Sequence, residues 1–510
     1  MGQGLGQRKR RVLGHAHTEN EPVKATRTHA QAHRAAYALA DDTPEASAAH
    51  ALGVPAAIWA GPAAFLAVAE LVSAGMGLVI TGIVTGALFL VVAFLRLAAA
   101  RRPGQLSARR NLLSPALPSM TVIVALHKEA AVVAGLVDQL ARIDYPRDRL
   151  DVALAIEADD WDTLRAAHAA AKSVRAHLPV RVMAVPPIGP RTKPKALNFA
   201  LQRTQGALVA VYDAEDAPAP TQLRAAAEAF AADSQLGCVQ APLGWYNRNE
   251  NWLTRMFALE YAAQFHVVLP YFLRLGWPLP LGGTSNVFSR DALAACGGWD
   301  AHNVTEDADL GFRLARQGWK TGMIGHGTLE EAPVTVKAWT GQRSRWLKGH
   351  AISWCVHMRR PGELMRESDV RGLASLQLSL GMNVLSALAH GPAALWVMYL
   401  VGSALAAGSF PLVVLPVLAG YGAAIFAAGE GARRAGFTPS KRDLAALPLY
   451  WLLQTPAAIR ALREIGGQSY VWAKTEHGLT AQNRIAPDEP VPHARPSGRV
   501  ARPVPVRRVA

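Results

Sequence analysis

The chain has 510 residues, 51% of them apolar, a formal net charge of +15 at pH 7 and only three cysteines. Cysteines this few and this scattered exclude a disulfide framework and a cysteine zinc site. The positive charge does not indicate nucleic acid, because the basic residues crowd both ends of the chain and the flanks of apolar segments. Cytoplasmic loops of membrane proteins show this pattern. We therefore expect a polytopic membrane protein that binds no nucleic acid.

The N-terminal region divides into a polar part and an apolar part. Residues 1–50 are polar and lack apolar periodicity, so we predict a disordered basic tail. In residues 51–100 only Glu70 and Arg96 are charged. This stretch is long enough for two transmembrane helices, and we predict both.

Residues 114–361 alternate apolar runs with helical patterns. Runs that are apolar throughout are typical of parallel strands covered by helices on both faces. The predicted strands are residues 120–126, 151–158, 180–186 and 207–216. Ligands bind at the carboxyl ends of such strands, so the residues that follow each run are the candidates for a site.

Three acidic motifs follow this rule. The first is "IEADDWDT" at 156–163, after the second run, and the other two are considered by their chemistry. Asp213 and Glu215 follow the fourth run, and their spacing suits Mg²⁺ or Mn²⁺ with coordination positions left for phosphate oxygens. A solvated acidic turn explains them equally well. Glu306 and Asp307 stand in the first turn of a predicted helix that Thr305 would cap, and capping alone accounts for them. Taken singly, both motifs are ambiguous.

The order of the motifs along the chain is more specific. The order is Glu157, Asp213-x-Glu215, "TED" at 305–307 and "QRSRW" at 342–346. It resembles the processive family-2 glycosyltransferases, which include cellulose, chitin, hyaluronan and poly-N-acetylglucosamine synthases. The resemblance covers about residues 120–350 and includes "KPKALNFAL" at 193–201. It implies an α/β GT-A (nucleotide-diphospho-sugar transferase) domain, inserted here between transmembrane α-helices.

The resemblance also implies a role for each site residue. Asp307 would be the general base that takes a proton from the acceptor hydroxyl. Asp213 and Glu215 would hold Mg²⁺ or Mn²⁺, with Asp216 in reserve. Six residues would bind substrate: Glu157 near the uracil, Lys195 (with Lys193 as its competitor) and Arg345 at the diphosphate, Gln342 and Trp346 at the acceptor, and Glu306. Glu157 and Glu215 stand where the family usually has aspartate.

Three functions are compatible with this reading. The leading hypothesis is an inverting, membrane-embedded enzyme that transfers a sugar from a UDP-sugar to a growing β-linked polysaccharide, with UDP-glucose favoured and UDP-N-acetylglucosamine second. The alternative is a non-processive enzyme that glycosylates a membrane lipid. The third is a catalytically silent membrane scaffold or receptor of the same fold. The expected partners are the UDP-sugar, a polysaccharide or lipid acceptor, membrane lipid and unidentified secretion partners.

The remainder of the chain is predicted to be membrane-associated. Residues 372–465 form transmembrane or interfacial helices, and 444–462 is favoured as a re-entrant or interfacial segment because it contains two prolines. Basic flanks place the catalytic block in the cytoplasm, in a multi-pass protein of the inner (plasma) membrane with four crossings. Residues 487–510 form a disordered Pro- and Arg-rich tail. An aromatic and basic belt at the membrane surface would explain Trp339, Arg343 and Lys348.

Overall fold

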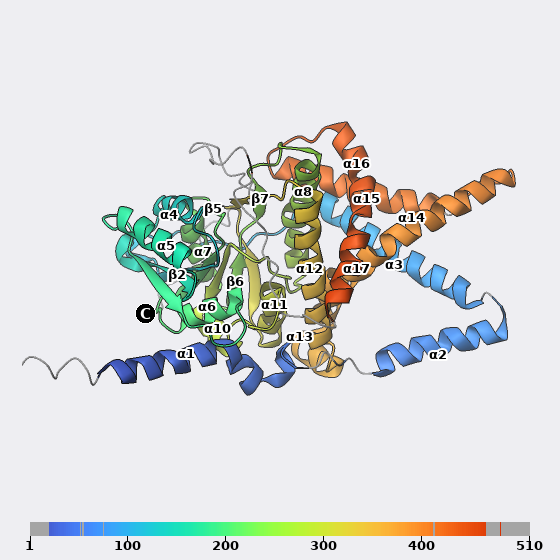
Figure 1. Ribbon diagram of the computed structural model, residues 1–510. Helices are drawn as coiled ribbons and strands as arrows, with labels where there is room; N and C mark the ends of the chain where they lie inside the picture. The colour runs from blue at the N-terminus through green and yellow to red at the C-terminus, as the bar shows by residue number, and fades with distance from the viewer. Residues whose placement is uncertain are drawn as a thin grey trace, which may run out of the picture.

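The computed structural model describes residues 20–50, 53, 56–74, 76–411, 414–465 and 480. An α/β block makes up one half of the molecule, and two helical arms project from the other half (Figure 1). One arm is the hairpin of α2 (Ala56–Val72) and α3 (Met76–Arg101), and the other is α14 (Met382–Ala406). The predicted tail at 487–510 lies outside the described residues.

Seven strands form the main sheet, in the order β3-β2-β1-β4-β8-β6-β9. Their bounds are β1 Met120–Leu126, β2 Leu150–Glu157, β3 Val180–Val185, β4 Leu208–Tyr212, β6 Leu236–Gln240, β8 Asn286–Ser289 and β9 Lys320–Met323. The four predicted strands are all present as β1 to β4. Val122 and Val124 of β1 pack into one buried cluster, whereas Ile123 and Ala125 pack into another on the opposite face. An apolar run without alternation is therefore required, because both faces are covered.

Helices cover each face of this sheet. One side carries α4 (Val133–Ala141), α5 (Trp161–Ser173) and α7 (Gln222–Ala232), and the other carries α6 (Lys193–Leu201), α10 (Arg290–Ala295) and α11 (Glu306–Arg316). A smaller second sheet, in the order β5-β10-β7, consists of Ala217–Pro218, Thr328–Glu330 and Leu243–Trp245. Its strand β5 contacts α4, and its strand β7 contacts α8 (Trp252–Ala263), beside which it lies in Figure 1.

The prediction of a wholly parallel sheet is wrong at β8. This strand runs antiparallel to both of its neighbours, β4 and β6. It has only four residues, and they follow the polar and glycine-rich segment 282–285, so it leaves no apolar run in the sequence. The outcome is a mixed sheet.

The prediction that residues 1–50 are disordered is wrong for residues 20–50. Helix α1 (Asn20–Asp42) packs against α6, and its Ala32 and Ala35 are fully buried there. Gln31 Oε1 accepts hydrogen bonds from the Arg203 guanidinium at 2.8 and 3.1 Å. Small alanines let the two helices approach closely, yet they add little to the hydrophobic signal of the sequence.

The membrane-side helices have the bounds α8 Trp252–Ala263, α9 Leu269–Arg274, α12 Val336–His357, α13 Pro361–Leu376, α15 Val414–Arg434, α16 Lys441–Leu452 and α17 Gln454–Ile465. Two helical stretches in the described part of the chain, Pro361–Ala406 and Leu415–Arg434, are long and apolar enough to cross a membrane. The helices α16 and α17 have 12 residues each and are not among these two stretches. We predicted four membrane crossings, which is more than these two candidate stretches, and that number stays a prediction.

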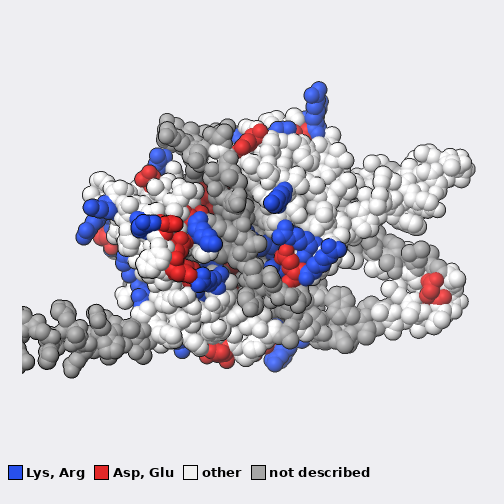
Figure 2. Space-filling view, in the orientation of Figure 1, with Lys and Arg blue, Asp and Glu red and all other residues white. Residues whose placement is uncertain are grey.

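The surfaces of the projecting arms are suited to lipid. Leu71, Phe94 and Leu395 expose 86%, 70% and 67% of their surface. Figure 2 shows the arms almost free of charged side chains, whereas acidic and basic side chains gather on the α/β block and beside it. Exposed apolar surface of this extent marks an interaction site, and on these helices it supports membrane association.

Candidate active site

The side chain of Lys193, in the first turn of α6, lies among carboxylates from two distant parts of the chain. Its Nζ forms an ion pair with Asp213, which follows β4, and donates to the carbonyl oxygen of Gly283 at 2.6 Å. Burial lowers the pKa of Lys193, but the negative charges of Asp213, Glu306 and Asp307 outweigh it and raise the pKa overall. The end of β4 and the start of α11 therefore converge on one ammonium group, as the sequence predicted for a shared site.

Asp307 and Glu306 have different proton affinities. Burial raises the pKa of Asp307 to about 6, and the charges of Lys193 and Arg345 keep it from rising further. Burial and the neighbouring Asp307 charge raise the pKa of Glu306 to about 8. At neutral pH, Asp307 is then mostly ionised and Glu306 mostly protonated. A carboxylate with its pKa just below the ambient pH is suited to act as a general base.

Glycine at position 349 allows α12 to approach the start of α11. A Cβ atom there would lie only 2.3 Å from Thr305 Oγ1. Asn303 Nδ2 also donates to Ser353 Oγ of α12 at 2.9 Å. Thr305 occupies the N-cap position of α11, but its side chain bonds to no backbone N–H, so the predicted side-chain cap is wrong. This close contact brings α12, which carries Arg345, against the start of α11, and the charge of Arg345 lowers the pKa of Asp307 there.

The motif "QRSRW" presents three of its side chains on α12. Gln342 Oε1 and Arg345 Nε have no hydrogen-bond partner within the part of the chain that the structure describes. The half-buried Trp346 ring lies 5.9 Å from the Phe257 ring and 6.0 Å from the Tyr261 ring, both on α8. The motif therefore combines the aromatic surface of Trp346 with two polar side chains, Gln342 and Arg345, that have unused hydrogen-bonding capacity.

Lys195 and Glu157 form a separate, buried pair. Lys195 Nζ lies 2.7 Å from one Glu157 carboxylate oxygen and 3.0 Å from the other. Neither side chain exposes more than 5% of its surface. Lys193, which the sequence interpretation placed second, is the lysine that contacts the Asp213 group. Both lysines occur in the same "KPK" segment, so only the three-dimensional arrangement could rank them.

Comparison with known proteins identifies this block. Residues 118–349 match the family described as Glycosyltransferase like family 2. The chain carries a family-2 glycosyltransferase domain. Its fold is of the GT-A type and is similar to that of the mannosyltransferase PcManGT from Pyrobaculum calidifontis, solved in complex with GDP-Man and Mn²⁺. That likeness has a TM-score of 0.51 at 21% identity and covers 74% of this chain and 97% of that one.

Curated relatives of the glycosyltransferase domain include two β-monoglucosyldiacylglycerol synthases. The one from Synechocystis sp. is 33% identical over 235 residues, which are 46% of this chain and 48% of the relative. The one from Nostoc sp. is 30% identical over 239 residues, which are 46% and 49% of the two chains. The chain thus spans about half the length of the curated relatives it matches.

Several carboxylates of the glycosyltransferase domain lie close together around Asp213. Burial and the charges of Asp213 and Glu129 raise the pKa of Glu215 to about 8. Asp216 Oδ2 accepts from the Asp213 backbone N–H at 2.8 Å, so Asp216 holds the turn that presents Asp213. Repulsion between neighbouring carboxylates raises their pKa values, and a divalent cation bound between them would offset that repulsion. Within the described ranges, no three or more His, Cys, Asp or Glu side chains are grouped so that they could hold a metal ion.

Glu330, on β10, is a member of this acidic group that sequence reasoning missed. It is 8% exposed, and burial together with the charges of Asp216, Glu215 and Asp213 raises its pKa well above the usual value. Its Oε1 atom has no hydrogen-bond partner in the described structure. The only sequence signal is the pair of glutamates at 330–331, about 115 residues beyond Asp213.

The membrane-belt interpretation of Trp339, Arg343 and Lys348 is wrong, because all three are buried. Arg343 donates to Glu260 of α8 at 2.8 Å, and its guanidinium carbon lies 4.9 Å from the centre of the Trp346 ring. Trp339 Nε1 donates to the Tyr450 hydroxyl at 3.1 Å. These contacts fix α12, and with it Trp346, between α8 and α16.

Proposed function

We propose that this chain transfers a sugar, with glucose from UDP-glucose as the first candidate, to the hydroxyl of a membrane lipid. The observation that carries the proposal is the convergence of Asp213, Glu306 and Asp307 on Lys193. Two things support the lipid acceptor: the curated relatives are named for glucosylation of diacylglycerol, and the projecting arms expose apolar surface. The proposal includes an inner (plasma) membrane location with the glycosyltransferase domain in the cytoplasm.

The reaction is a single displacement at the anomeric carbon. Asp307 accepts the proton of the lipid hydroxyl while the hydroxyl oxygen bonds to the anomeric carbon. The bond between that carbon and the diphosphate breaks, and UDP departs with its electron pair. One inversion converts an α-linked donor into a β-linked product. Lys193 and Arg345 offset the charge on the departing diphosphate. Glu157 near the uracil and Gln342 and Trp346 at the acceptor complete the proposed substrate contacts.

Mg²⁺ or Mn²⁺ is the proposed cofactor, with Asp213 and Glu215 as its ligands. The cation would neutralise diphosphate charge during departure. Two observations support it: the mutual rise in the pKa values of the acidic group, and Mn²⁺ in the complex of the mannosyltransferase of similar fold.

A processive β-glycan synthase is the second candidate. It is favoured by the order of the TED and QRSRW motifs and by Trp346, an aromatic surface on which a sugar ring can stack. The named relatives favour the lipid acceptor over this alternative.

Product analysis with the full chain in nanodiscs tests the proposal. The assay contains diacylglycerol, Mg²⁺ or Mn²⁺ and radiolabelled UDP-glucose, with UDP-N-acetylglucosamine and UDP-galactose in parallel. We expect one or a few discrete glycolipids, resolved by thin-layer chromatography and mass spectrometry. A long polymer would replace this proposal by the processive alternative, and UDP release without any sugar transfer would overturn both.

A further inference from the structure

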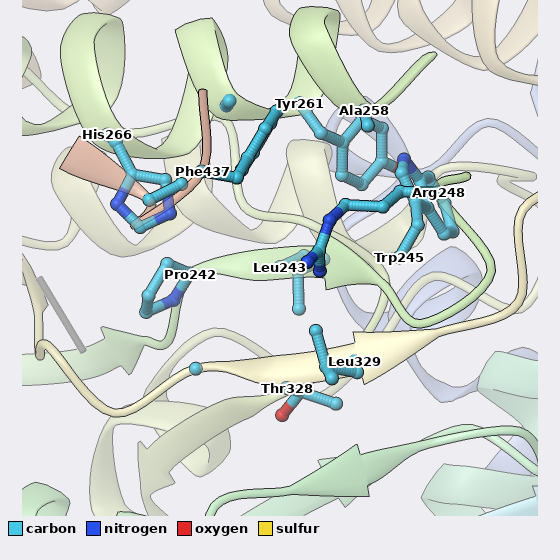
Figure 3. Close-up of a pocket in the computed structure, with 14 residues that line it drawn as sticks. Pro242, Leu243, Trp245, Arg248, Ala258, Tyr261, His266, Thr328, Leu329 and Phe437 are labelled. Carbon is cyan, nitrogen blue, oxygen red and sulfur yellow. The ribbon is translucent and has the colours of Figure 1, made fainter. Parts of the chain in front are cut away.

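A pocket lies on the membrane side of the glycosyltransferase domain, between the second sheet and α8. Figure 3 shows its lining side chains, with Tyr261 and Ala258 from α8 on one side and the strands that carry Leu243 and Leu329 on the other. Phe437, which follows α15, and His266 close one end. The pocket holds about 440 Å³ of empty space, part of it open to solvent.

One end of the pocket adjoins the candidate active site. The Tyr261 ring lies 4.3 Å from the Trp245 ring inside the pocket and 6.0 Å from the Trp346 ring outside it. Leu329 is followed directly by Glu330, which belongs to the acidic group around Asp213. A ligand in the pocket could therefore reach the proposed acceptor surface past a single aromatic ring.

The other end lies where membrane-side helices terminate. Arg434, the last residue of α15, donates to the carbonyl oxygens of His266 at 3.1 Å and of Ala100 at 2.7 Å. Ala100 lies near the end of α3, so this arginine fastens two membrane-side helices to the wall of the pocket. A lipid moving from those helices towards Trp346 would pass this point.

The lining is mostly apolar, and two of its polar side chains are hydrogen-bond donors with unused capacity. Trp245 Nε1 is buried and has no hydrogen-bond partner among the described residues. The Arg248 guanidinium lies over the Phe437 ring, at 5.4 Å from its centre, and forms no ion pair within the described ranges. A buried indole N–H without an acceptor is rare in proteins and calls for an explanation. Apolar walls with unused donors suit a molecule that has hydrocarbon chains and carbonyl oxygens.

We propose that this pocket binds the acyl-ester portion of a diacylglycerol-type acceptor. The ester carbonyl accepts from Trp245 Nε1, and the acyl chain lies along Leu243 and Leu329. The free hydroxyl of the glycerol then extends past Tyr261 towards Asp307. This assignment rests on the proposed function, because it names the site of the lipid that receives the sugar.

Steady-state kinetics of the full chain in nanodiscs test the assignment, with Trp245→Phe, Arg248→Gln and the control Trp161→Phe. Trp161 lies on α5, outside the pocket, and is 70% exposed. Its replacement by phenylalanine is therefore the same chemical change at a position that does not line the pocket. Trp245→Phe keeps an aromatic ring and removes only the N–H. We expect it to raise KM for diacylglycerol about five- to tenfold, the loss of one hydrogen bond, with KM for UDP-glucose unchanged. Arg248→Gln should act in the same direction, and Trp161→Phe should change neither constant.

Photolabelling separates the possible failures. Wild-type chain is irradiated with diacylglycerol that carries a diazirine on one acyl chain, and labelled peptides are identified by mass spectrometry. We expect labels within residues 242–262, reduced in Trp245→Phe. If the wild type glucosylates diacylglycerol but the labels lie elsewhere and both variants keep the wild-type KM, the pocket assignment is overturned and the proposed function stands. If the wild type glucosylates no lipid, the proposed function fails and the pocket assignment fails with it.

Discussion

Lys195 Nζ lies 2.7 Å from Glu157 Oε1, in a pair that joins the end of β2 to the first turn of α6. The lysine is completely buried, and the glutamate is 4% exposed. Burial raises the pKa of Glu157 even though the charge of Lys195 opposes the rise. Because Lys193 is in the same helical turn, this pair also fixes the position from which Lys193 contacts Asp213.

Replacement of Lys195 by methionine should be strongly destabilising. It leaves Glu157 buried without its partner, and losses of about 3–5 kcal/mol are typical of such a change. The double variant Lys195→Met/Glu157→Met removes both charges and should recover most of the loss. Thermal unfolding in detergent measures the effect, with the exposed Lys172→Met as the control. A double variant no more stable than the single one would contradict this account of the pair.

The rate of sugar transfer should depend on the ionisation of Asp307. The base works only when unprotonated, and its pKa is raised to about 6. We expect kcat/KM to fall about tenfold for each pH unit below 6 and to level off above it. A profile of lipid glucosylation from pH 4.5 to 8.5 measures this limb. A flat profile between pH 5 and 7 would show that Asp307 does not titrate in the rate-determining step.

Asp213 should contribute more than Glu215 to use of a divalent cation. Asp213 is held by its backbone contact with Asp216, whereas the pKa of Glu215 is raised to about 8 and its charged form is disfavoured. We expect Asp213→Asn to raise the Mn²⁺ concentration for half-maximal activity at least tenfold, and Glu215→Gln to raise it less. Titration of chelator-treated protein with Mn²⁺ measures both. Equal effects of the two changes, or activity independent of Mn²⁺ and Mg²⁺, would refute the assignment.

The N-terminal segment should stabilise the loop that leads into α11. Arg359 donates to the carbonyl oxygens of Glu45 and Ser47, each at 2.9 Å, and Ser47 Oγ donates to Asp300 at 3.1 Å. Arg359→Ala removes the hydrogen bonds to Glu45 and Ser47 and leaves the one between Ser47 and Asp300. We therefore expect a loss of about 1–3 kcal/mol in the free energy of unfolding and a severalfold lower kcat.

The adjacent Arg360→Ala is a matched control for this change. Arg360 is exposed, and its guanidinium bonds only to Glu363 within the described residues, at 3.4 and 3.5 Å. Loss of this side chain should therefore change the free energy of unfolding by less than about 0.5 kcal/mol. Denaturant unfolding of the purified variants compares the two. Equal stability of both variants would show that residues 44–50 do not brace the loop.

Much of the fold could be predicted because burial on both faces of the sheet leaves a strong signal. The runs that became β1 to β4 are apolar throughout, and their carboxyl ends led directly to Asp213. Strand β8 was not predicted, because a four-residue strand after a glycine-rich segment leaves no periodic pattern. Helix α1 was missed since its contact surface consists of alanines, which composition alone does not distinguish from a solvated tail.

The sequence predicted which residues belong to the candidate site better than it predicted how they are arranged. The motif order brought together Asp213, Asp307 and Arg345, but it could not decide which lysine of "KPK" faces them. That choice depends on how α6 is rotated over the sheet. Glu330 reaches the acidic group only through the second sheet, whose strands of two or three residues carry no recognisable sequence pattern.

Formation of glucosyl lipid by Asp307→Asn, compared with Asp291→Asn, tests the central claim most directly. Asp291 is an exposed acid in the first turn of α10, so its variant controls for loss of a helix-terminal charge. We predict that Asp307→Asn lowers kcat at least about 100-fold while UDP binding, measured by calorimetry, is unchanged, and that Asp291→Asn keeps wild-type turnover. Wild-type turnover in Asp307→Asn would contradict the account.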